Sequence, residues 1–339
     1  MILVTGGTGL VGSHLLYHLV AQNENIVAIH RKSSDLSAVK NVFSYYTSES
    51  DQLFATIKWI EADILDMPSL TKAFDGVTTV FHSAALISYN ASDYKIMRKV
   101  NIEGTANIVN LCIENNIKKL CFVSSIAAIG KSLLDEELTE NNEWNVEENN
   151  YGYAITKYGA EIEVWRASQE GVDVVIVNPG VIIGGGFWQN GPGKLFTSMY
   201  NGFKFYTEGI TGFVGITDLV LVMIKLMNCD IKNERYILVS ENQSFKNVFF
   251  AIADGLNKKR PSIKATKFLS GLAWRVEWFL EKITGKKAMI TKQTAYSSQN
   301  KYLHSNKKIK EALCYEFEPL TDSIKTTCKY YLRDIKINS

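Results

Sequence analysis

The stretch Thr5–Gly12, TGGTGLVG, directly follows the apolar run Ile2–Val4 and leads into an apolar segment, 11–20, with helical spacing. A strand that ends in closely spaced glycines and continues into a helix is how a doubly wound sheet holds a dinucleotide pyrophosphate. The glycines satisfy both G-x-G-x-x-G and G-x-x-G-x-x-G, and either spacing alone is a weak signal. A glycine-rich turn without a ligand is the alternative, but the flanking strand and helix favour dinucleotide binding.

The residues of this turn have separate expected roles. Gly6 can adopt backbone angles that other residues avoid. Gly9 lets the main chain approach the phosphates, and Gly12 lets the helix pack against its strand. The free N–H groups at the helix start then face the negative charge. We therefore predict that the cofactor is bound by Gly6, Gly9, Leu10, Val11 and Gly12.

The composition is that of an ordinary globular protein with ample core. The 339 residues include 46% hydrophobic and 21% charged residues, and the net charge of +2 gives no reason to expect nucleic acid. Five scattered cysteines without a C-x-x-C pair argue against a zinc site or a disulfide framework. No secretory leader precedes the first predicted strand, and no apolar run has the length of a membrane span. We therefore expect a cytoplasmic protein.

Short β-branched segments alternate with helical patterns through the first half of the chain. They predict strands at 26–29, 58–62, 79–83, 119–124 and 172–177, and helices that include 96–115 and 153–170. This alternation indicates βαβ units and an α/β fold with a doubly wound parallel sheet of the Rossmann type. We expect the dinucleotide-binding domain over 1–178. A smaller substrate-binding region, partly interleaved with the sheet, should occupy 179–339.

Tyr153 and Lys157 lie one turn apart on the same face of a predicted helix. A Tyr-x-x-x-Lys pair arises easily by chance, and the chain contains a second, Tyr200 and Lys204. Only the first pair follows a strand that ends in two serines, 124–125, and opens a helix that leads to another strand. We therefore expect the first pair to be functional and the second tyrosine to be structural.

A serine, a tyrosine and a lysine in this arrangement suit the interconversion of a carbonyl and an alcohol. A carbonyl that accepts hydride becomes an alkoxide, which must receive a proton as it forms. Tyrosine, with a reference pKa of about 10, is a poor base near neutral pH. A nearby ammonium favours the phenolate and lowers that pKa. The same lysine can hold the nicotinamide ribose, and the serine hydroxyl can polarise the substrate oxygen.

The chain resembles the short-chain dehydrogenase/reductase family in its extended form, over nearly all of residues 1 to about 220. Several motifs occur in the family's order: Thr5-Gly6-x-x-Gly9-x-x-Gly12, Asp63-Ile64, His82-x-Ala84-Ala85, Asn101-x-x-Gly104-Thr105, Ser124-Ser125, Tyr153-x-x-x-Lys157 and Asn178-Pro179-Gly180. The resemblance implies that Ser125, rather than Ser124, is catalytic together with Tyr153 and Lys157.

The same resemblance implies further cofactor contacts. The adenine contacts are Asp63 and Ile64, and the loop beneath the cofactor contains Ser83, Ala84 and Ala85. The residues near the nicotinamide are Asn101, Pro179 and Val181. Ordinary core positions for the alanines and a helix cap for Asn101 are the alternatives.

The turn after the second predicted strand bears on the choice of cofactor. An enzyme that prefers NAD usually has an acidic residue there, which accepts hydrogen bonds from the ribose hydroxyls. Here the strand is followed by Arg31 and Lys32, with no carboxylate before Asp35. Arg31 can bind a 2′-phosphate with two hydrogen bonds, and Lys32 adds a charge. We therefore expect NADP(H) rather than NAD, although an ordinary exposed turn is the alternative.

The residues after Ser125 separate the branches of the family. Dehydratases usually have an Asp-Glu pair there, whereas this chain has Ile126-Ala127-Ala128. Epimerases usually have Tyr-Gly in place of Ile129-Gly130 and hold NAD tightly. The chain most resembles the dihydroflavonol-4-reductase and 3β-hydroxysteroid dehydrogenase branch, so we expect an NAD(P)-dependent oxidoreductase for an apolar ketone, aldehyde or alcohol. A nucleotide-sugar epimerase or dehydratase, or an NADP-binding protein without turnover, is the alternative.

Candidates for the substrate wall, which could equally be core, are Ile87, Tyr89, Phe187, Trp188, Phe203 and Phe205.

The last third of the chain is less informative. The apolar segment Phe268–Ile283 could lie on a bilayer surface, but such helices more often pack on their own protein, so membrane contact is not our expectation. Basic runs at 258–260, 286–287 and 307–308 are dispersed, which favours a solvated face over a nucleic-acid patch. We expect a small-molecule substrate and no metal, because His14 and His18 have no third ligand beside them. The resemblance implies a homodimer through the helices around Asn101 and Tyr153.

Overall fold

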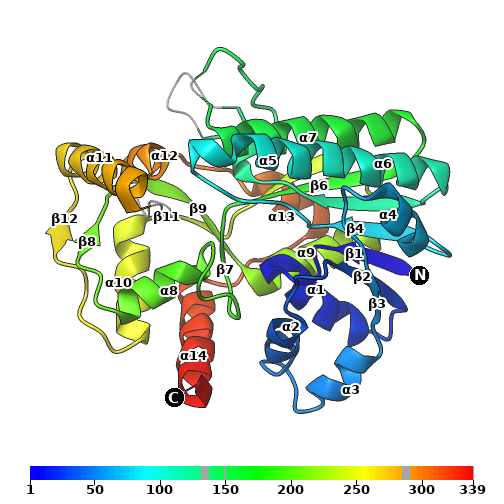
Figure 1. Ribbon diagram of the computed structural model, residues 1–339, viewed down its shortest axis with the longest axis horizontal. Helices are drawn as coiled ribbons and strands as arrows, with labels where there is room; N and C mark the ends of the chain where they lie inside the picture. Colours follow the sequence, from blue (N-terminus) through cyan, green and yellow to red (C-terminus); the bar gives the residue numbers. More distant parts are fainter. Residues whose placement is uncertain (131–136, 149, 285–290, 339) are drawn as a thin grey trace.

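A parallel sheet of seven strands, in the order β10-β6-β5-β4-β1-β2-β3, forms the centre of the computed structural model (Figure 1). The structure describes residues 1–130, 137–148, 150–284 and 291–338. The strands are β1 (Ile2–Thr5), β2 (Ile26–His30), β3 (Lys58–Glu61), β4 (Thr79–His82), β5 (Lys119–Val123), β6 (Asp173–Pro179) and β10 (Glu234–Leu238). The predicted doubly wound α/β fold is confirmed.

Strand order reverses beside β1. The chain adds β2 and β3 on one side of β1, then crosses back to place β4, β5 and β6 on the other. In open parallel sheets a ligand binds outside the carboxyl ends of the strands at such a reversal. The glycine turn leaves β1 at this point, so the topology places it where a dinucleotide is expected.

Helices cover both faces of the sheet, and the alternation of side chains along each strand explains why (Figure 1). Leu3 packs in the cluster beneath α4 (Met67–Ala73), α6 (Gly104–Glu114) and α7 (Gly152–Gln169). Its neighbour Val4 packs in the opposite cluster, with α1 (Leu10–Val20), α2 (Leu36–Phe43) and α9 (Ile216–Met227). The short helix α3 (Ser50–Ala55) also lies on this second side. Strands buried on both faces account for their nearly continuous apolar sequences.

The predicted helix over 96–115 is not one regular helix. It consists of α5 (Tyr94–Arg98), a π-helical segment η2 (Lys99–Glu103) and α6. A π-helical turn is uncommon and often occurs at functional sites. Its effect here is to hold the side chain of Asn101 against the loop after β4, as described below. Two 3₁₀ turns, η1 (Ala91–Asp93) and η3 (Ile126–Ala128), lie near the same edge of the sheet.

The second half of the chain contributes β10 to the main sheet and also builds a smaller unit with its own hydrophobic cluster. Its small sheets contain β7 (Val181–Ile183), β9 (Ile210–Gly215) and β11 (Glu241–Ser244), and β8 (Phe205–Tyr206) with β12 (Ile263–Lys264). Its helices are α8 (Gly193–Tyr200), α10 (Phe245–Gly255), α11 (Lys267–Thr284), α12 (Lys292–Ser297) and α14 (Leu320–Asn338). Helix α13 (Lys307–Leu313) instead packs on the main sheet, where Ile309 belongs to the same core cluster as Val4. Lys286 and Lys287, part of the predicted basic face, lie outside the described residues. In the described ranges, no helix combines the length and apolar character needed to cross a bilayer.

Candidate functional site

The glycine turn after β1 has the geometry that its sequence predicts. Gly6 has a φ of +71°, which favours glycine, and its carbonyl accepts a hydrogen bond from the Gly9 amide at 2.9 Å. A Cβ on Gly12 would lie 2.2 Å from the Gly6 oxygen, so helix α1 can approach the turn only without a side chain there. A Cβ on Gly9 would meet only that same oxygen, at 3.4 Å. The protein's own packing therefore requires Gly6 and Gly12, whereas the space beside Gly9 is open to a ligand.

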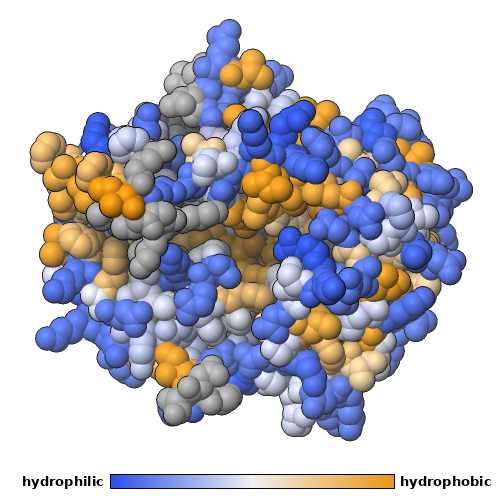
Figure 2. All heavy atoms as spheres, in the orientation of Figure 1, coloured by the Kyte–Doolittle hydropathy of each residue, from blue (hydrophilic) through white to orange (hydrophobic). Residues whose placement is uncertain are grey.

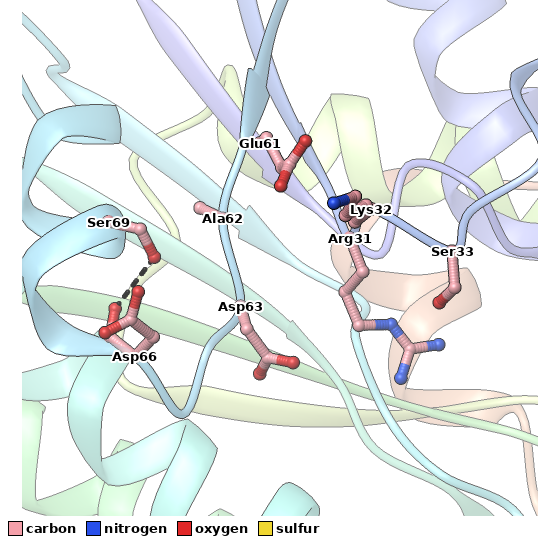
Figure 3. A pocket seen from close by; sticks show the side chains of 8 residues that line it. All are labelled: Arg31, Lys32, Ser33, Glu61, Ala62, Asp63, Asp66 and Ser69. Atoms are coloured by element: carbon pink, nitrogen blue, oxygen red, sulfur yellow. Dashed lines mark hydrogen bonds between the residues drawn. The ribbon is translucent and has the colours of Figure 1, made fainter.

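A surface cavity of about 600 Å³ lies at the ends of β2 and β3. Figure 3 shows the Arg31 and Asp63 side chains projecting in the same direction from neighbouring strand ends. Within the described residues the Arg31 guanidinium makes no ion pair, so its donors are available to a ligand. Three carboxylates line the cavity as well, and two of them, Glu61 and Asp66, were not among the predicted residues. The predicted Ile64 differs from Asp63: its side chain is buried against Gly104.

The loop after β4 is fixed to the glycine turn by hydrogen bonds. The Ser83 hydroxyl donates to the Thr5 carbonyl at 2.7 Å, and a Cβ on Gly6 would lie 2.6 Å from the Ala84 nitrogen. Ala84 packs against the core cluster, whereas Ala85 is exposed and so is not a core residue. The two segments therefore form one continuous floor at the strand reversal, where the resemblance placed the cofactor.

Asn101 is buried and uses its side chain to join three segments. Its oxygen accepts from the Leu86 amide at 2.7 Å, and its nitrogen donates to the Leu86 carbonyl and the Thr156 hydroxyl, both at 3.0 Å. These bonds tie the loop after β4 to helix α7, one residue before Lys157. Asn101 is therefore held as a positioning residue, which is more than a helix cap.

Ser125 and Tyr153 meet at the carboxyl end of β5. Ser125 caps η3, where its hydroxyl accepts from the Ala127 amide at 3.1 Å. Burial raises the pKa of the Tyr153 phenol, and a hydrogen bond with the Ser125 side chain acts in the opposite direction. In this site the phenol is therefore protonated at neutral pH and lies near the serine side chain. Tyr89 and Tyr151 pack around Tyr153, each with its ring centroid 6.3 Å away.

Lys157 is a fully buried cation on the same face of α7. Its ammonium donates to the Val123 carbonyl at 2.7 Å and lies 4.2 Å from the centre of the Phe122 ring. Burial lowers the pKa of Lys157 to about 7, while the charge of Glu161 opposes that shift. An ammonium has three donors, and the carbonyl uses one of them. The others fit the proposed contact with ribose hydroxyls.

A buried polar network behind these residues was not predicted. Glu161, one turn after Lys157, is 1% exposed, accepts from Asn178 at 2.6 Å and forms an ion pair with Arg235 at 3.3 Å. Asn178 also donates to the Ser125 carbonyl at 2.9 Å. The network thus joins the Ser125 carbonyl, through Asn178, to a carboxylate whose charge acts on Lys157. The i, i+4 spacing of Lys157 and Glu161 is a signal in the sequence, but the strand that supplies Arg235 is far away in the chain.

The six candidates for the substrate wall do not form one wall. Ile87 and Tyr89 lie in the loop beside Tyr153 and are 53% and 42% exposed. Trp188 instead packs in the cluster of the smaller unit, with its indole N–H donating to Asp334 at 2.8 Å. Phe203 packs against Phe205 at the edge of that unit. Of these residues, Tyr89 packs against Tyr153, and Ile87 is exposed in the same loop, so this pair is the candidate for contact with a substrate there.

The remaining predicted residues occupy different surroundings. Pro179 ends β6 and is buried, and Val181 begins β7 and is half-buried. Tyr200, of the second Tyr-x-x-x-Lys pair, packs in the smaller unit with the Lys258 ammonium 4.0 Å from its ring centre. Its surroundings agree with the structural role predicted for it. Among the described residues, no cluster of histidine, cysteine and acidic side chains could hold a metal.

Fold and glycine turn together define a dinucleotide-binding enzyme built on a doubly wound sheet. The comparison with known families identifies it further: the chain belongs to the NAD dependent epimerase/dehydratase family, whose model matches residues 2–216. It is an NAD(P)-dependent oxidoreductase of that family, as the reductases among its relatives also indicate. The predicted membership is confirmed.

Individual relatives are distant. "Sterol demethylase protein B" of Methylococcus capsulatus is 26% identical over 278 residues, which are 80% of this chain and 79% of that protein. A "putative dihydroflavonol 4-reductase" of Synechocystis is 34% identical over 181 residues, which are 53% of this chain and 49% of that protein. The crystal structure of UDP-glucose 4-epimerase from Thermotoga maritima superposes with a TM-score of 0.76 at 19% identity, covering 98% of this chain and 99% of that one. This last likeness is one of fold alone.

Proposed function

We propose that this protein interconverts a ketone or aldehyde and an alcohol on an apolar small molecule, with Tyr153 as the acid and base. The observation that carries the proposal is the placement of the Tyr153 phenol near the Ser125 side chain, with the buried Lys157 ammonium one turn further along the same helix. A phenol, a second hydroxyl and a cation at the carboxyl edge of the sheet are the groups that proton transfer to a carbonyl oxygen requires.

A bound nicotinamide dinucleotide supplies or accepts the hydride in such a reaction. In the reduction, Ser125 donates a hydrogen bond to the substrate oxygen, and Tyr153 gives its proton to that oxygen as negative charge develops on it. The raised pKa of Tyr153 keeps the phenol protonated and ready for this direction. In the oxidation, Tyr153 must lose its proton, and the positive charge of Lys157 favours the phenolate. Asn101 and the Glu161 network hold helix α7 so that these groups stay in register.

Two features support an apolar substrate that is not a nucleotide sugar. Figure 2 shows a hollow in the middle of this face with hydrophobic side chains inside it, near the position of β7 and β9 in Figure 1. The residues after Ser125 form the apolar turn η3 and provide no carboxylate for eliminating water. The names of two relatives, a sterol demethylase protein and a putative dihydroflavonol reductase, also refer to ring compounds that are not nucleotide sugars.

The test is turnover of a panel of apolar ketones and alcohols, followed by comparison of two variants. Tyr153→Phe removes only the hydroxyl and should lower kcat by about 10² or more, or roughly 3 kcal/mol of barrier. Tyr200→Phe is the matched control, because Tyr200 has the same sequence pattern but packs in the smaller unit. A Tyr153→Phe enzyme with wild-type kcat, or a crippled Tyr200→Phe enzyme, would overturn the assignment.

We further propose that NADP(H) is preferred over NAD(H). Support comes from Arg31, which lines the cavity at the end of β2 without an ion pair among the described residues. A charge-assisted bond to a 2′-phosphate is worth about 1.5–3 kcal/mol, so Arg31→Ala should weaken NADPH binding at least about tenfold and leave NADH nearly unchanged. Arg98→Ala, on the exposed surface of α5, is the control. Equal affinity of the wild type for both cofactors would refute this preference.

A further inference from the structure

Helix α11 exposes an apolar stripe to solvent. Phe268, Leu272, Val276, Phe279 and Ile283 recur at intervals of three or four residues and are between 49% and 83% exposed. This spacing places all five on one side of the helix. We name these five residues the α11 stripe. Figure 2 shows the same region as a hydrophobic area at the edge of the molecule.

The opposite side of α11 faces the protein. Ser270 is buried and accepts a hydrogen bond from Gln299, next to helix α12. Glu281 accepts from Asn90 at 2.7 Å, in the loop that leads to α5, and Glu277 is half-buried. Both acidic residues of the helix are thus turned away from the α11 stripe. The expectation that this helix packs on its own protein is met on this side only.

Positive charge adjoins the α11 stripe. Arg275 and Lys267 are exposed, and the segment 258–266 just before the helix has four further cations and no acidic residue, although Lys258 packs on the Tyr200 ring. Two of these cations, Arg260 and Lys264, pair with Asp254 and Glu208 at the surface, and exposed pairs of this kind are weak. Ile263 and Phe205, paired in the β12–β8 ladder beside the start of α11, add further exposed apolar surface (Figure 1).

We propose that α11 and the basic segment before it bind the surface of an anionic lipid bilayer, with the helix lying in the plane of the interface. Apolar residues on one side, flanking cations and acids turned inward are the arrangement that such interfacial helices use. No described helix is fit to cross the bilayer, so the contact is peripheral. A second copy of the chain would cover the apolar residues equally well, but like charges on the basic segments would then oppose each other. This inference is independent of the proposed reaction.

The experiment is flotation of the full-length protein with vesicles, which needs no substrate. Vesicles of phosphatidylcholine with about 30% phosphatidylglycerol should carry the wild type upward at low salt, whereas pure phosphatidylcholine vesicles should carry much less. The double variant Phe268→Ser, Phe279→Ser should reduce the bound fraction at least about tenfold, because it removes two aromatic rings that would otherwise insert into the bilayer interface. Lys259→Glu with Lys267→Glu should abolish the preference for the anionic vesicles.

The control is Val146→Ser with Leu303→Ser, which removes two exposed apolar side chains elsewhere. All of these positions are exposed, so each variant should unfold at the wild-type urea concentration, and turnover should be retained. Failure of the wild type to float, equal binding to both vesicles, or equal effects of the two apolar variants would overturn the proposal. The proposal would also be overturned if the wild type does not float and sedimentation without lipid shows an oligomer that the double variant Phe268→Ser, Phe279→Ser dissociates. That result would assign the α11 stripe to contact between copies of the chain.

Discussion

Replacing Glu161 by glutamine removes one buried negative charge next to Lys157 while keeping the size of the side chain. The carboxylate is 1% exposed and opposes the lowering of the Lys157 pKa, which lies at about 7. Side chains one turn apart on a helix are about 6 Å apart, which corresponds to roughly 3 kcal/mol at an effective dielectric constant near 20. That is roughly two pKa units for a fully ionised carboxylate, and burial, which raises the pKa of Glu161, reduces it. We therefore expect the pKa of Lys157 to fall by about one further unit.

The consequence should appear in the oxidation direction, where Tyr153 has to become a phenolate. Lys157 would be largely neutral at pH 7, so the phenolate would lose its nearby cation. The apparent pKa that controls kcat for alcohol oxidation should rise by about one unit, and kcat at neutral pH should fall about tenfold. The variant should fold, because Arg235 keeps its hydrogen bonds to the Glu140 carbonyl.

The assay is the pH dependence of kcat for the wild type, Glu161→Gln and a control, Glu163→Gln. Glu163 lies on the same helix but pairs with Arg166 at the surface. Urea unfolding of each variant separates a change in stability from a change in the pH profile. If Glu161→Gln lowers stability yet its profile coincides with that of the wild type, the carboxylate has a structural role only and the electrostatic reasoning is wrong.

Two other predictions concern the glycine turn and the buried lysine. Gly12→Ala should lower the free energy of unfolding by about 1–3 kcal/mol through overpacking, since its Cβ would lie 2.2 Å from the Gly6 oxygen. Gly9→Ala should unfold like the wild type but bind the dinucleotide at least about tenfold more weakly, and equal destabilisation of the two variants would contradict this. Burial lowers the pKa of Lys157, so above pH 7 the unfolded chain binds more protons than the folded chain. The free energy of unfolding therefore increases as pH rises, and the destabilisation caused by burying the charged lysine disappears. Lys157→Met should therefore be more stable than the wild type near pH 7, and this difference in the free energy of unfolding should shrink by up to about 1.4 kcal/mol per pH unit between about pH 7 and 10. Urea unfolding at several pH values measures the difference, and a difference that stays constant would refute the prediction.

The local parts of the site could be predicted from the sequence because each depends on residues close together in the chain. The glycine turn needs only a strand, a φ that favours glycine and a helix start, all within residues 2–20. Tyr153 and Lys157 are four residues apart, and this spacing places two side chains on the same face of any α-helix. The alternation of apolar segments likewise determined the parallel sheet and hence which strand ends lie on one edge.

The contacts between distant segments depended on the tertiary structure. Arg235 reaches Glu161 only because β10 joins the sheet beside β6, a pairing that no local pattern encodes. The π-helical turn that orients Asn101 likewise depends on the loop after β4 and on α7.

Among the aromatic residues, the sequence could not separate Tyr89, which faces Tyr153, from Trp188, which packs in the smaller unit. The amphipathic spacing of α11 is present in the sequence, but which side is covered depends on Asn90 and α12. The sequence by itself thus determined the sheet, the glycine turn and the helical pair, because short-range geometry specifies them. Burial, charge coupling and the exposed face of α11 were decided by packing between segments far apart in the chain.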